Sequence, residues 1–347
     1  MFFKENKIIP LDKFINEALY NESKGYYMKN NPFGYNGDYI TAPNISILFS
    51  EMIAIWLVAF WEKLNSPKKI NIVELGAGNG EMMYQINKSV EKFKFFNSAT
   101  NFFIFEKSKN LKNLQKEKNN YFNVKWIDDF KSMPKVPTVF IANEFFDALP
   151  IKQFKKIGKV WFERCIRKKK QKFEFCFKKT NVSSLEKKIE KKITKNQNFI
   201  EYSPLSLKFL KSISEIINKN NGAMLMIDYG YNREKMFDTL IGYKKHRKIN
   251  ILDNVYNSDI THFINFNFYK RVLNKFNLDC INLTSQRNFL IKMGVQERAE
   301  ILSKNLSFSK KADLYLRLQR LINKTQMGEL FKVLMATRKK NFFNLGF

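Results

Sequence analysis

The sequence predicts an α/β protein built on a doubly wound, mainly parallel sheet. Three observations support this prediction: short apolar segments alternate with helical ones, a glycine-rich turn follows the first of them, and acidic residues stand where several of them end. Such alternation is typical of parallel strands whose sheet is covered by helices on both faces. The chain has 347 residues, of which 44% are hydrophobic, so it can form the buried core that this fold needs.

Five short, largely apolar segments define the predicted sheet. They cover residues 70–75, 101–105, 122–127, 138–142 and 223–227. Helical spacing of apolar side chains between several of them occurs at residues 81–90, 111–118 and 205–217. The strands therefore follow one another through helical crossovers, as parallel pairing requires.

Residues 1–64 are predicted to form a helical and lid segment in front of the core, which occupies residues 65–347. A helix over residues 11–20 and a second, buried helix that ends near residue 64 flank a turn-rich stretch at residues 30–44. A structured loop in front of a helix is either a lid or a plain connector.

An insertion at about residues 151–200 separates the fourth and fifth strands. Residues 160–166 and 173–177 alternate in polarity around Lys-rich turns, which predicts a β-hairpin. The basic run at residues 187–195 is expected to be a solvated surface segment. For the C-terminal third we expect a strand pair at residues 278–283 and 289–293 and helices at residues 296–304 and 311–324.

The chain is strongly basic. Lysine and arginine exceed aspartate and glutamate by 61 − 32 = 29, and the sequence pI is near 9.8. This charge favours acidic partners, but the joint abundance of Lys, Asn, Ile and Phe is also what an AT-rich genome encodes. Arginine, which reads bases by bidentate contacts, is scarce beside lysine, so nucleic acid is a disfavoured partner.

The cysteines and histidines indicate neither a metal site nor a disulfide framework. Cys165, Cys176 and Cys280 form no CxxC pair, and the chain contains two histidines. The longest apolar run falls short of the ~20 residues that span a bilayer. The first residues lack a secretory or transit pattern, so we expect a protein of the bacterial cytoplasm rather than of the mitochondrial matrix.

The strongest functional signal is the turn after the first strand. Glu74 ends that strand, and Gly76, Gly78 and Gly80 lead into the next helix. Glycine lets the backbone turn tightly and approach a ligand, and the helix N-terminus offers free N–H groups. Glu81 stands where a dinucleotide fingerprint needs its third glycine. The loop therefore suits a ligand with an amino-acid moiety and no phosphates, with a plain strand–helix turn as the alternative.

Acidic residues follow the second and third strands. Glu106 ends the second strand, where a carboxylate can accept hydrogen bonds from both hydroxyls of a ribose. Asp128 and Asp129 follow the third strand and could bond an adenine amino group. A glutamate at a strand end is as often a solvated charge, but its place after the glycine loop favours the ligand role.

Two further carboxylates, flanked by aromatic residues, follow the fourth strand. The segment begins at Asn143 and places Glu144 and Asp147 at the edge where ligands bind in this architecture. Two partly desolvated acids can hold a cationic substrate, whereas the alternative is that they cap the next helix. Asp228 ends the fifth strand at the same edge and is a weaker candidate.

With these segments in place, the chain resembles the MidA-like family of methyltransferases, which includes the mitochondrial complex I assembly methyltransferase. The motifs that carry the resemblance are Gly25-Tyr26-Tyr27-Met28, Pro32-Phe33-Gly34, Gly37-Asp38-Tyr39-Ile40-Thr41-Ala42-Pro43, the Glu74–Gly80 loop, Asn143–Pro150, Trp161 with Glu163-Arg164, Ile227-Asp228-Tyr229-Gly230, Phe289-Leu290 and Met327–Val333. The chain departs from the family pattern at Ala77, Asn79, Asn44, His262 and Asn265.

The resemblance implies a class I methyltransferase fold with an N-terminal helical extension and an inserted β-hairpin. It also implies methylation of arginine side chains of a protein partner, in the mitochondrial member a subunit of respiratory complex I. We therefore expect S-adenosyl-L-methionine as the cofactor and no metal ion. The expected cofactor-binding residues are Glu74, Gly76, Gly78, Gly80, Glu106, Asp128 and Asn143.

In this hypothesis Glu144 and Asp147 are catalytic, because they would bind and polarise a guanidinium group while a lid over residues 37–46 closes. Two alternatives remain open. One is a methyltransferase that acts on RNA or a small molecule, which the basic surface favours. The other is a cofactor-binding assembly factor without catalysis, which the departures near residues 263 and 265 favour. The oligomeric state stays open.

Overall fold

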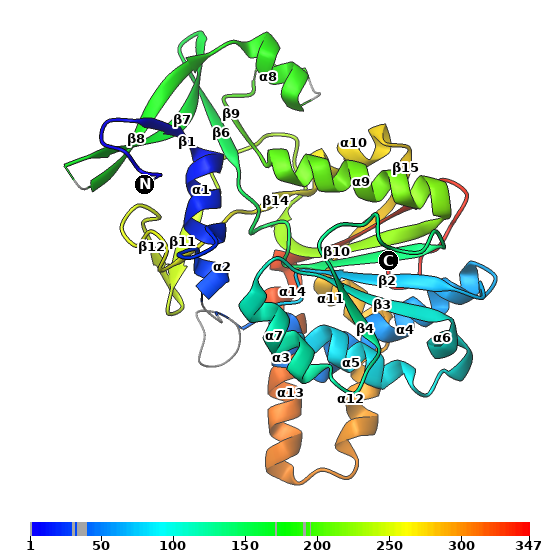
Figure 1. The fold of residues 1–347 in the computed structure, drawn as a ribbon. Helices are drawn as coiled ribbons and strands as arrows, with labels where there is room; N and C mark the ends of the chain where they lie inside the picture. The colour runs from blue at the N-terminus through cyan, green and yellow to red at the C-terminus, as the bar shows by residue number, and fades with distance from the viewer. Residues whose placement is uncertain (1, 30–31, 33–39, 171, 190–191, 195) are drawn as a thin grey trace.

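The computed structural model describes residues 2–29, 32, 40–170, 172–189, 192–194 and 196–347. Its centre is an eight-stranded mixed sheet in the order β15-β16-β10-β5-β2-β3-β4, with β14 paired to β10 (Figure 1). The strands are β2 (Ile70–Leu75), β3 (Thr100–Phe105), β4 (Val124–Ile127), β5 (Thr138–Asn143), β10 (Gly222–Tyr231), β14 (Ile264–Asn265), β15 (Leu278–Ser285) and β16 (Phe331–Arg338). Neighbours from β4 to β10 pair parallel, whereas β16 pairs antiparallel with both β10 and β15.

The order of the strands determines where a ligand can bind. From β2 the chain moves outward through β3 to β4 and then returns to β5 on the other side of β2. The crossovers carry α5 (Glu81–Val90), α6 (Lys94–Ala99) and α7 (Lys109–Lys118). The carboxyl ends of β2 and β5 therefore flank the point where the strand order reverses, which is the ligand crevice of doubly wound sheets.

Helices cover both faces of the central sheet (Figure 1). One face packs in a single apolar cluster against helices from the N-terminal and C-terminal parts of the chain. These are α3 (Ala42–Ile45), α4 (Ile47–Lys63), α5, α6, α11 (Gln286–Lys292), α12 (Val295–Ser303) and α13 (Phe308–Ile322). The other face packs against α9 (Pro204–Asn220) and α10 (Phe266–Lys275). The short helix α14 (Met327–Leu330) leads directly into β16.

The inserted segment forms a second sheet together with the N-terminus. Its order is β1-β7-β6-β9, with β8 paired to β7, and its pairs are antiparallel. The elements are β1 (Ile8–Pro10), β6 (Lys152–Ile157), β7 (Val160–Lys169), β8 (Lys172–Thr180), α8 (Val182–Ile189) and β9 (Phe199–Tyr202). Helices α1 (Leu11–Tyr20) and α2 (Tyr26–Lys29) pack in an apolar cluster with residues from this sheet. A third sheet joins β12 (Arg247–Ile249), β11 (Ile241–Lys244) and β13 (Asp259–Thr261).

All five predicted strands and the inserted hairpin are confirmed, and β2, α1 and α5 have the predicted bounds. The predicted strand at residues 289–293 is wrong, because this stretch lies in α11, where Phe289 and Leu290 are buried on one helix face. Strand β15 pairs instead with β16, which was not predicted as a strand. A short apolar run has no periodicity that separates a buried helix from a strand, which explains the error.

Two other predictions fall partly outside the described residues. Within the loop at residues 30–44, the structure describes residue 32 and residues 40–44, and within the lid at residues 37–46 it describes residues 40–46. In the basic run at residues 187–195, the described Ile189 is buried rather than solvated. In the described part of the chain, helices with the length and apolar character of a membrane span are absent.

Candidate functional site

The glycine loop after β2 has the conformation that its glycines were predicted to provide. Gly76, Gly78 and Gly80 all have positive φ, at 64°, 55° and 79°. L-residues with side chains rarely adopt this region, so glycine is required for the course of the backbone. A Cβ atom on Gly76 would lie 2.8 Å from Cδ2 of Phe145, so the loop also passes close to the segment after β5.

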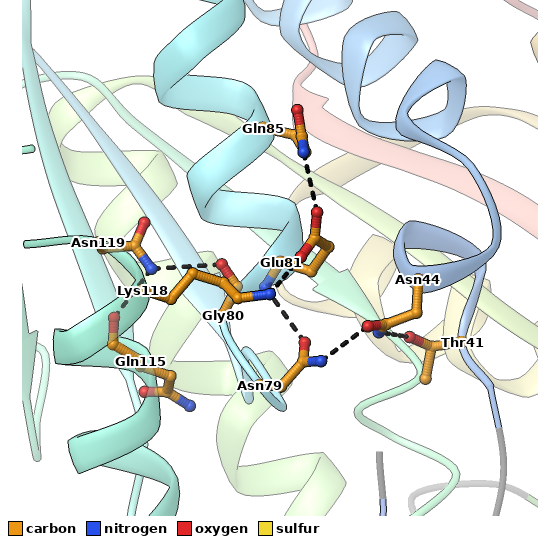
Figure 2. A network of polar contacts seen from close by, with 9 residues as sticks. All are labelled: Thr41, Asn44, Asn79, Gly80, Glu81, Gln85, Gln115, Lys118 and Asn119. Atoms are coloured by element: carbon orange, nitrogen blue, oxygen red, sulfur yellow. Dashed lines mark hydrogen bonds and ion pairs between the residues drawn. The ribbon is translucent and has the colours of Figure 1, made fainter. Parts of the chain in front are cut away.

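Polar side chains hold the loop against a neighbouring segment, as Figure 2 shows. The amide of Asn79 accepts a hydrogen bond from the Glu81 backbone N–H (3.3 Å) and donates to Oδ1 of Asn44 (2.7 Å). Asn44 in turn donates to the Thr41 hydroxyl (2.8 Å), and Nδ2 of Asn119 donates to the Gly80 carbonyl (3.3 Å). The described part of the predicted lid is thus linked directly to the glycine loop.

Two buried acceptors at this junction have no hydrogen-bond partner among the described residues. They are Oε2 of Glu74 and Oδ1 of Asn143, and both side chains line a small cavity between the glycine loop and residues 41–44. Burial raises the pKa of Glu74 to about 8. A buried acceptor without a donor is energetically costly, so these atoms suit a ligand that brings donors, such as an ammonium group.

Glu106 lies where it was predicted, at the end of β3. One carboxylate oxygen accepts hydrogen bonds from the backbone N–H groups of Lys107 (2.8 Å) and Ser108 (2.9 Å). Nε2 of Gln115 donates to the other oxygen (3.1 Å) and to the Gly78 carbonyl (2.9 Å). Burial raises the pKa of Glu106, and these hydrogen bonds favour its ionised form.

Gln115 is a site residue that the sequence pattern did not reveal. It is a fully buried amide on α7 that joins the glycine loop to Glu106, and its Oε1 also accepts a hydrogen bond from Nε1 of Trp126 (2.9 Å). The signal that could have identified it is its place one helical turn after the buried Leu111, on the inward face of an otherwise charged helix. A buried polar residue on such a face needs partners.

Asp128 follows β4 beside the strand that ends before Glu106, but its side chain points toward solvent. Its side chain is 81% exposed and pairs with Nζ of Lys112 at 2.5 Å. Together with Asp129 and Phe130 it lines a shallow neighbouring hollow rather than the cavity that holds Glu106. Its predicted contact with an adenine amino group stays a prediction.

Glu144 is the charged residue shared by the described linings of the two cavities. It lines both the small cavity and a larger one with about 730 Å³ of empty space, which extends to Glu106. It directly follows β5 and has φ 49°, in the left-handed region that non-glycine residues adopt uncommonly. Its carboxylate accepts long hydrogen bonds from the Ala42 N–H (3.4 Å) and from Nδ2 of Asn143 (3.3 Å). Burial, followed by the charge of Asp147, raises the pKa of Glu144 to about 8.

Asp147 lies behind Glu144, and its carboxylate contacts protein groups. Oδ2 accepts hydrogen bonds from the hydroxyls of Tyr229 (2.6 Å) and Thr261 (2.8 Å). The Asp147 backbone N–H donates to Asp228 at 3.3 Å. Asp147 is buried and is not among the described residues that line either cavity. The structure therefore brings the two predicted catalytic carboxylates together, but only Glu144 faces open space.

The larger cavity has aromatic walls that come from distant parts of the chain. Phe145 and Phe209 lie edge to face on the side of β5 and α9, with centroids 5.2 Å apart. Tyr20 and Tyr27 from the N-terminal helices complete the lining. The motif that contains Tyr27 was prominent in the sequence but had no predicted role, and Tyr20 was not predicted at the site.

The family departures at His262 and Asn265 are not among the described lining residues, but His262 contacts Leu149, which lines the larger cavity. His262 is buried with its imidazole 3.2 Å from the Leu149 carbonyl, and burial lowers its pKa to about 4. Asn265 caps α10 by accepting a hydrogen bond from the Phe268 N–H (3.0 Å). Both residues therefore have structural partners, and His262 supports the segment after β5 from behind the lining.

Comparisons with known proteins agree with this geometry. The family model Methyltransf_28, described as "Putative S-adenosyl-L-methionine-dependent methyltransferase", matches residues 52–284. The protein arginine methyltransferase NDUFAF7, mitochondrial, of Xenopus laevis is 29% identical, with 96% of this chain and 82% of the relative covered. The Caenorhabditis elegans homologue is 31% identical, with 77% of this chain and 67% of the relative covered.

A solved structure supports the fold independently. The chain is similar to a Burkholderia thailandensis protein crystallised with bound S-adenosyl-homocysteine, with a TM-score of 0.83 and 22% identity. The similarity covers 98% of this chain and 90% of the solved one, so it includes the N-terminal helices and the insertion. The central sheet therefore belongs to a class I methyltransferase-like α/β fold.

Proposed function

The chain belongs to the Methyltransf_28 family of S-adenosyl-L-methionine-dependent methyltransferases, and we propose that it methylates arginine side chains of a protein partner. The observation that carries the proposal is the partly buried Glu144 carboxylate at the junction of the two cavities. The similarity to the Xenopus laevis and Caenorhabditis elegans arginine methyltransferases supports the choice of acceptor.

The donor set fits S-adenosyl-L-methionine, which is the cofactor of this family and supplies a methyl group activated by a sulfonium centre when bound. The unpaired acceptors of Glu74 and Asn143 would receive the ammonium group of its amino-acid end. Glu106, held by two backbone N–H groups and Gln115, has acceptor capacity left for ribose hydroxyls. Gly76 and Gly78 leave room for close approach of the ligand to the backbone.

Glu144 would bind the acceptor. Its carboxylate has two long hydrogen bonds, so it can still accept shorter ones from a guanidinium group. A bidentate pair with the carboxylate would orient one guanidinium nitrogen and polarise its lone pair, and this positioning supplies most of the rate effect. Asp147 acts through Glu144, because its negative charge is held within hydrogen-bond distance of Tyr229 and Thr261 rather than in the cavity.

The described end of the lid would exclude water from the reacting atoms. The Ala42 N–H reaches Glu144, and Asn44 reaches Asn79 of the glycine loop, so residues 41–44 are attached to both sides of the small cavity. Closure over a bound cofactor strengthens electrostatic interactions inside the site.

The proposal is tested by methyl transfer from tritiated S-adenosyl-L-methionine to the proteins of a bacterial extract, followed by hydrolysis and chromatography of methylated arginine. For Glu144→Gln we expect transfer to fall at least ~100-fold. Calorimetry should find the affinity for S-adenosylhomocysteine within about threefold of the wild type, because Glu74, Asn143 and Glu106, which would hold the cofactor, are unchanged. Glu300→Gln, an exposed carboxylate on α12, is the matched control and should retain full transfer. Equal loss of transfer and of cofactor binding in Glu144→Gln would contradict the acceptor role.

A further inference from the structure

Two stacked tyrosines of the N-terminal helices together line one side of the larger cavity. The rings of Tyr20 and Tyr27 stack, with centroids 5.6 Å apart and an interplanar angle of 26°. The Tyr20 hydroxyl donates to the Ala148 carbonyl (3.0 Å), and the Tyr27 hydroxyl donates to Oδ1 of Asp259 (2.7 Å). Because these protons point to protein acceptors, the pair offers the cavity mainly ring carbon and π surface.

Carboxylates surround this wall. Glu106 and Glu144 line the cavity with the tyrosines, whereas Lys107 is the one cation among the described lining residues and is exposed. Burial raises the pKa of Tyr20 well above its usual value, and the charges of Asp259, Asp147 and Glu106 raise it further. The phenol therefore stays neutral, whereas the carboxylates attract a cation once they are ionised. A cation gains from both the carboxylates and the ring faces.

We propose that Tyr20 and Tyr27 form the acceptor wall of the site and that this wall selects a flat cation, the guanidinium group, over an ammonium group. This inference rests on the proposed function and deepens it. A guanidinium is planar and weakly hydrated, so it can stack on the tyrosine face while it binds the Glu144 carboxylate with two N–H groups. An ammonium is a strongly hydrated point charge and gains less from a flat wall.

The test measures how tightly small probes bind to the full chain saturated with S-adenosylhomocysteine. Each probe is titrated into the protein, and binding is monitored by calorimetry and by the NMR signals of the tyrosine rings. The probes are the Nα-acetyl methylamides of arginine, of its neutral isostere citrulline, and of lysine. We expect the arginine probe to bind tightest and the citrulline probe weakest. Tyr20→Leu should lower the affinity for the arginine probe about tenfold. Tyr20→Phe and Tyr27→Phe, which keep the rings, should retain most of that affinity. Tyr121→Leu, at a tyrosine that is 88% exposed, is the control.

The outcomes separate this inference from the proposed function. Equal affinity for the arginine and citrulline probes, or no binding of either, overturns the wall as a cation site. If Tyr20→Leu lowers the affinity for S-adenosylhomocysteine by the same factor as the affinity for the arginine probe, the tyrosines contact the cofactor and the inference fails. If the wild type forms methylarginine and Tyr20→Leu leaves the KM for the acceptor unchanged, the inference fails and the function stands. If the wild type binds the cofactor but forms no methylarginine, the proposed function is contradicted.

Discussion

The two halves of the site are built in different ways. The proposed cofactor half is built around one local turn, the glycine loop at residues 74–80, together with Glu106 at the next strand end. The proposed acceptor half consists of side chains from segments far apart in the sequence, namely Tyr20 and Tyr27 together with Glu144. The geometry of the cofactor half therefore depends on the backbone conformation of one turn. The geometry of the acceptor half depends on how the whole N-terminal segment packs against the core.

This difference decides how each half should respond to substitution. Changes in the glycine loop alter the course of the backbone, which has no alternative conformation that keeps the ligand site. Changes in the acceptor half remove one contact among several, so their effects should be graded. The largest effect is therefore expected in the glycine loop.

Gly78→Val should abolish detectable binding of S-adenosylhomocysteine, with a loss of at least ~100-fold, because a β-branched residue at φ 55° is strained and Gly78 lines both cavities. Calorimetric titration measures the effect. Gly158→Val is the matched control, since Gly158 has φ 59° at the turn between β6 and β7, and a Cβ added there would meet no atom within 4 Å. Similar loss of binding in both variants would mean that general strain, not the loop, is responsible.

The contrast between the halves also explains what the sequence could predict. The glycine loop, β2 and Glu106 were predicted in place because each depends on neighbours along the chain. Gln115 and Tyr20 were missed because their roles arise from contacts with residues 9 to 128 positions away. Asp147 was predicted at the site edge, but only the fold reveals that its carboxylate contacts Tyr229 and Thr261 rather than open space.

The errors in the fold have the same cause. The stretch at residues 289–293 is apolar and short, and whether it becomes a strand or a helix depends on the space that β15 and β16 leave. The sequence predicted the inserted hairpin but not that β1 would join it, because pairing between residues 8–10 and 165–167 is a long-range contact.

The rate of methyl transfer should depend on pH through Glu144. Burial and Asp147 raise the pKa of this carboxyl to about 8, so below that pH it is neutral and cannot pair with a cation. We therefore expect kcat/KM for the acceptor to fall about tenfold per pH unit below 8 and to level off above it. The Glu144→Gln variant, which cannot ionise, should lose this dependence. A wild-type profile that is flat from about pH 6 to about pH 9 would contradict the assignment.

Gln115→Leu should weaken S-adenosylhomocysteine binding about fivefold, because the amide joins the Gly78 carbonyl to Glu106 and the variant leaves both without this donor. Gln115 lies outside the glycine loop, so this variant tests whether the cofactor half depends on a distant side chain as well as on the local turn. Calorimetry measures the affinity, and Gln319→Leu, at an exposed glutamine on α13, is the control. An unchanged affinity would show that the loop keeps its conformation without the bridge.

Asp147→Asn should have the smallest effect on the rate of methyl transfer. It should also shift the pH profile so that part of the rate is regained at neutral pH. The charge of Asp147 is the second cause of the raised pKa of Glu144, so its removal should lower that pKa and move the midpoint of the pH profile downward. At neutral pH more Glu144 would then be ionised, so part of the rate lost with Asp147 would be regained. Asp253→Asn, at an exposed aspartate, should leave the midpoint in place. An unchanged midpoint in Asp147→Asn, together with loss of transfer at every pH, would mean that Asp147 contacts the acceptor directly, and the acceptor half would then extend behind Glu144.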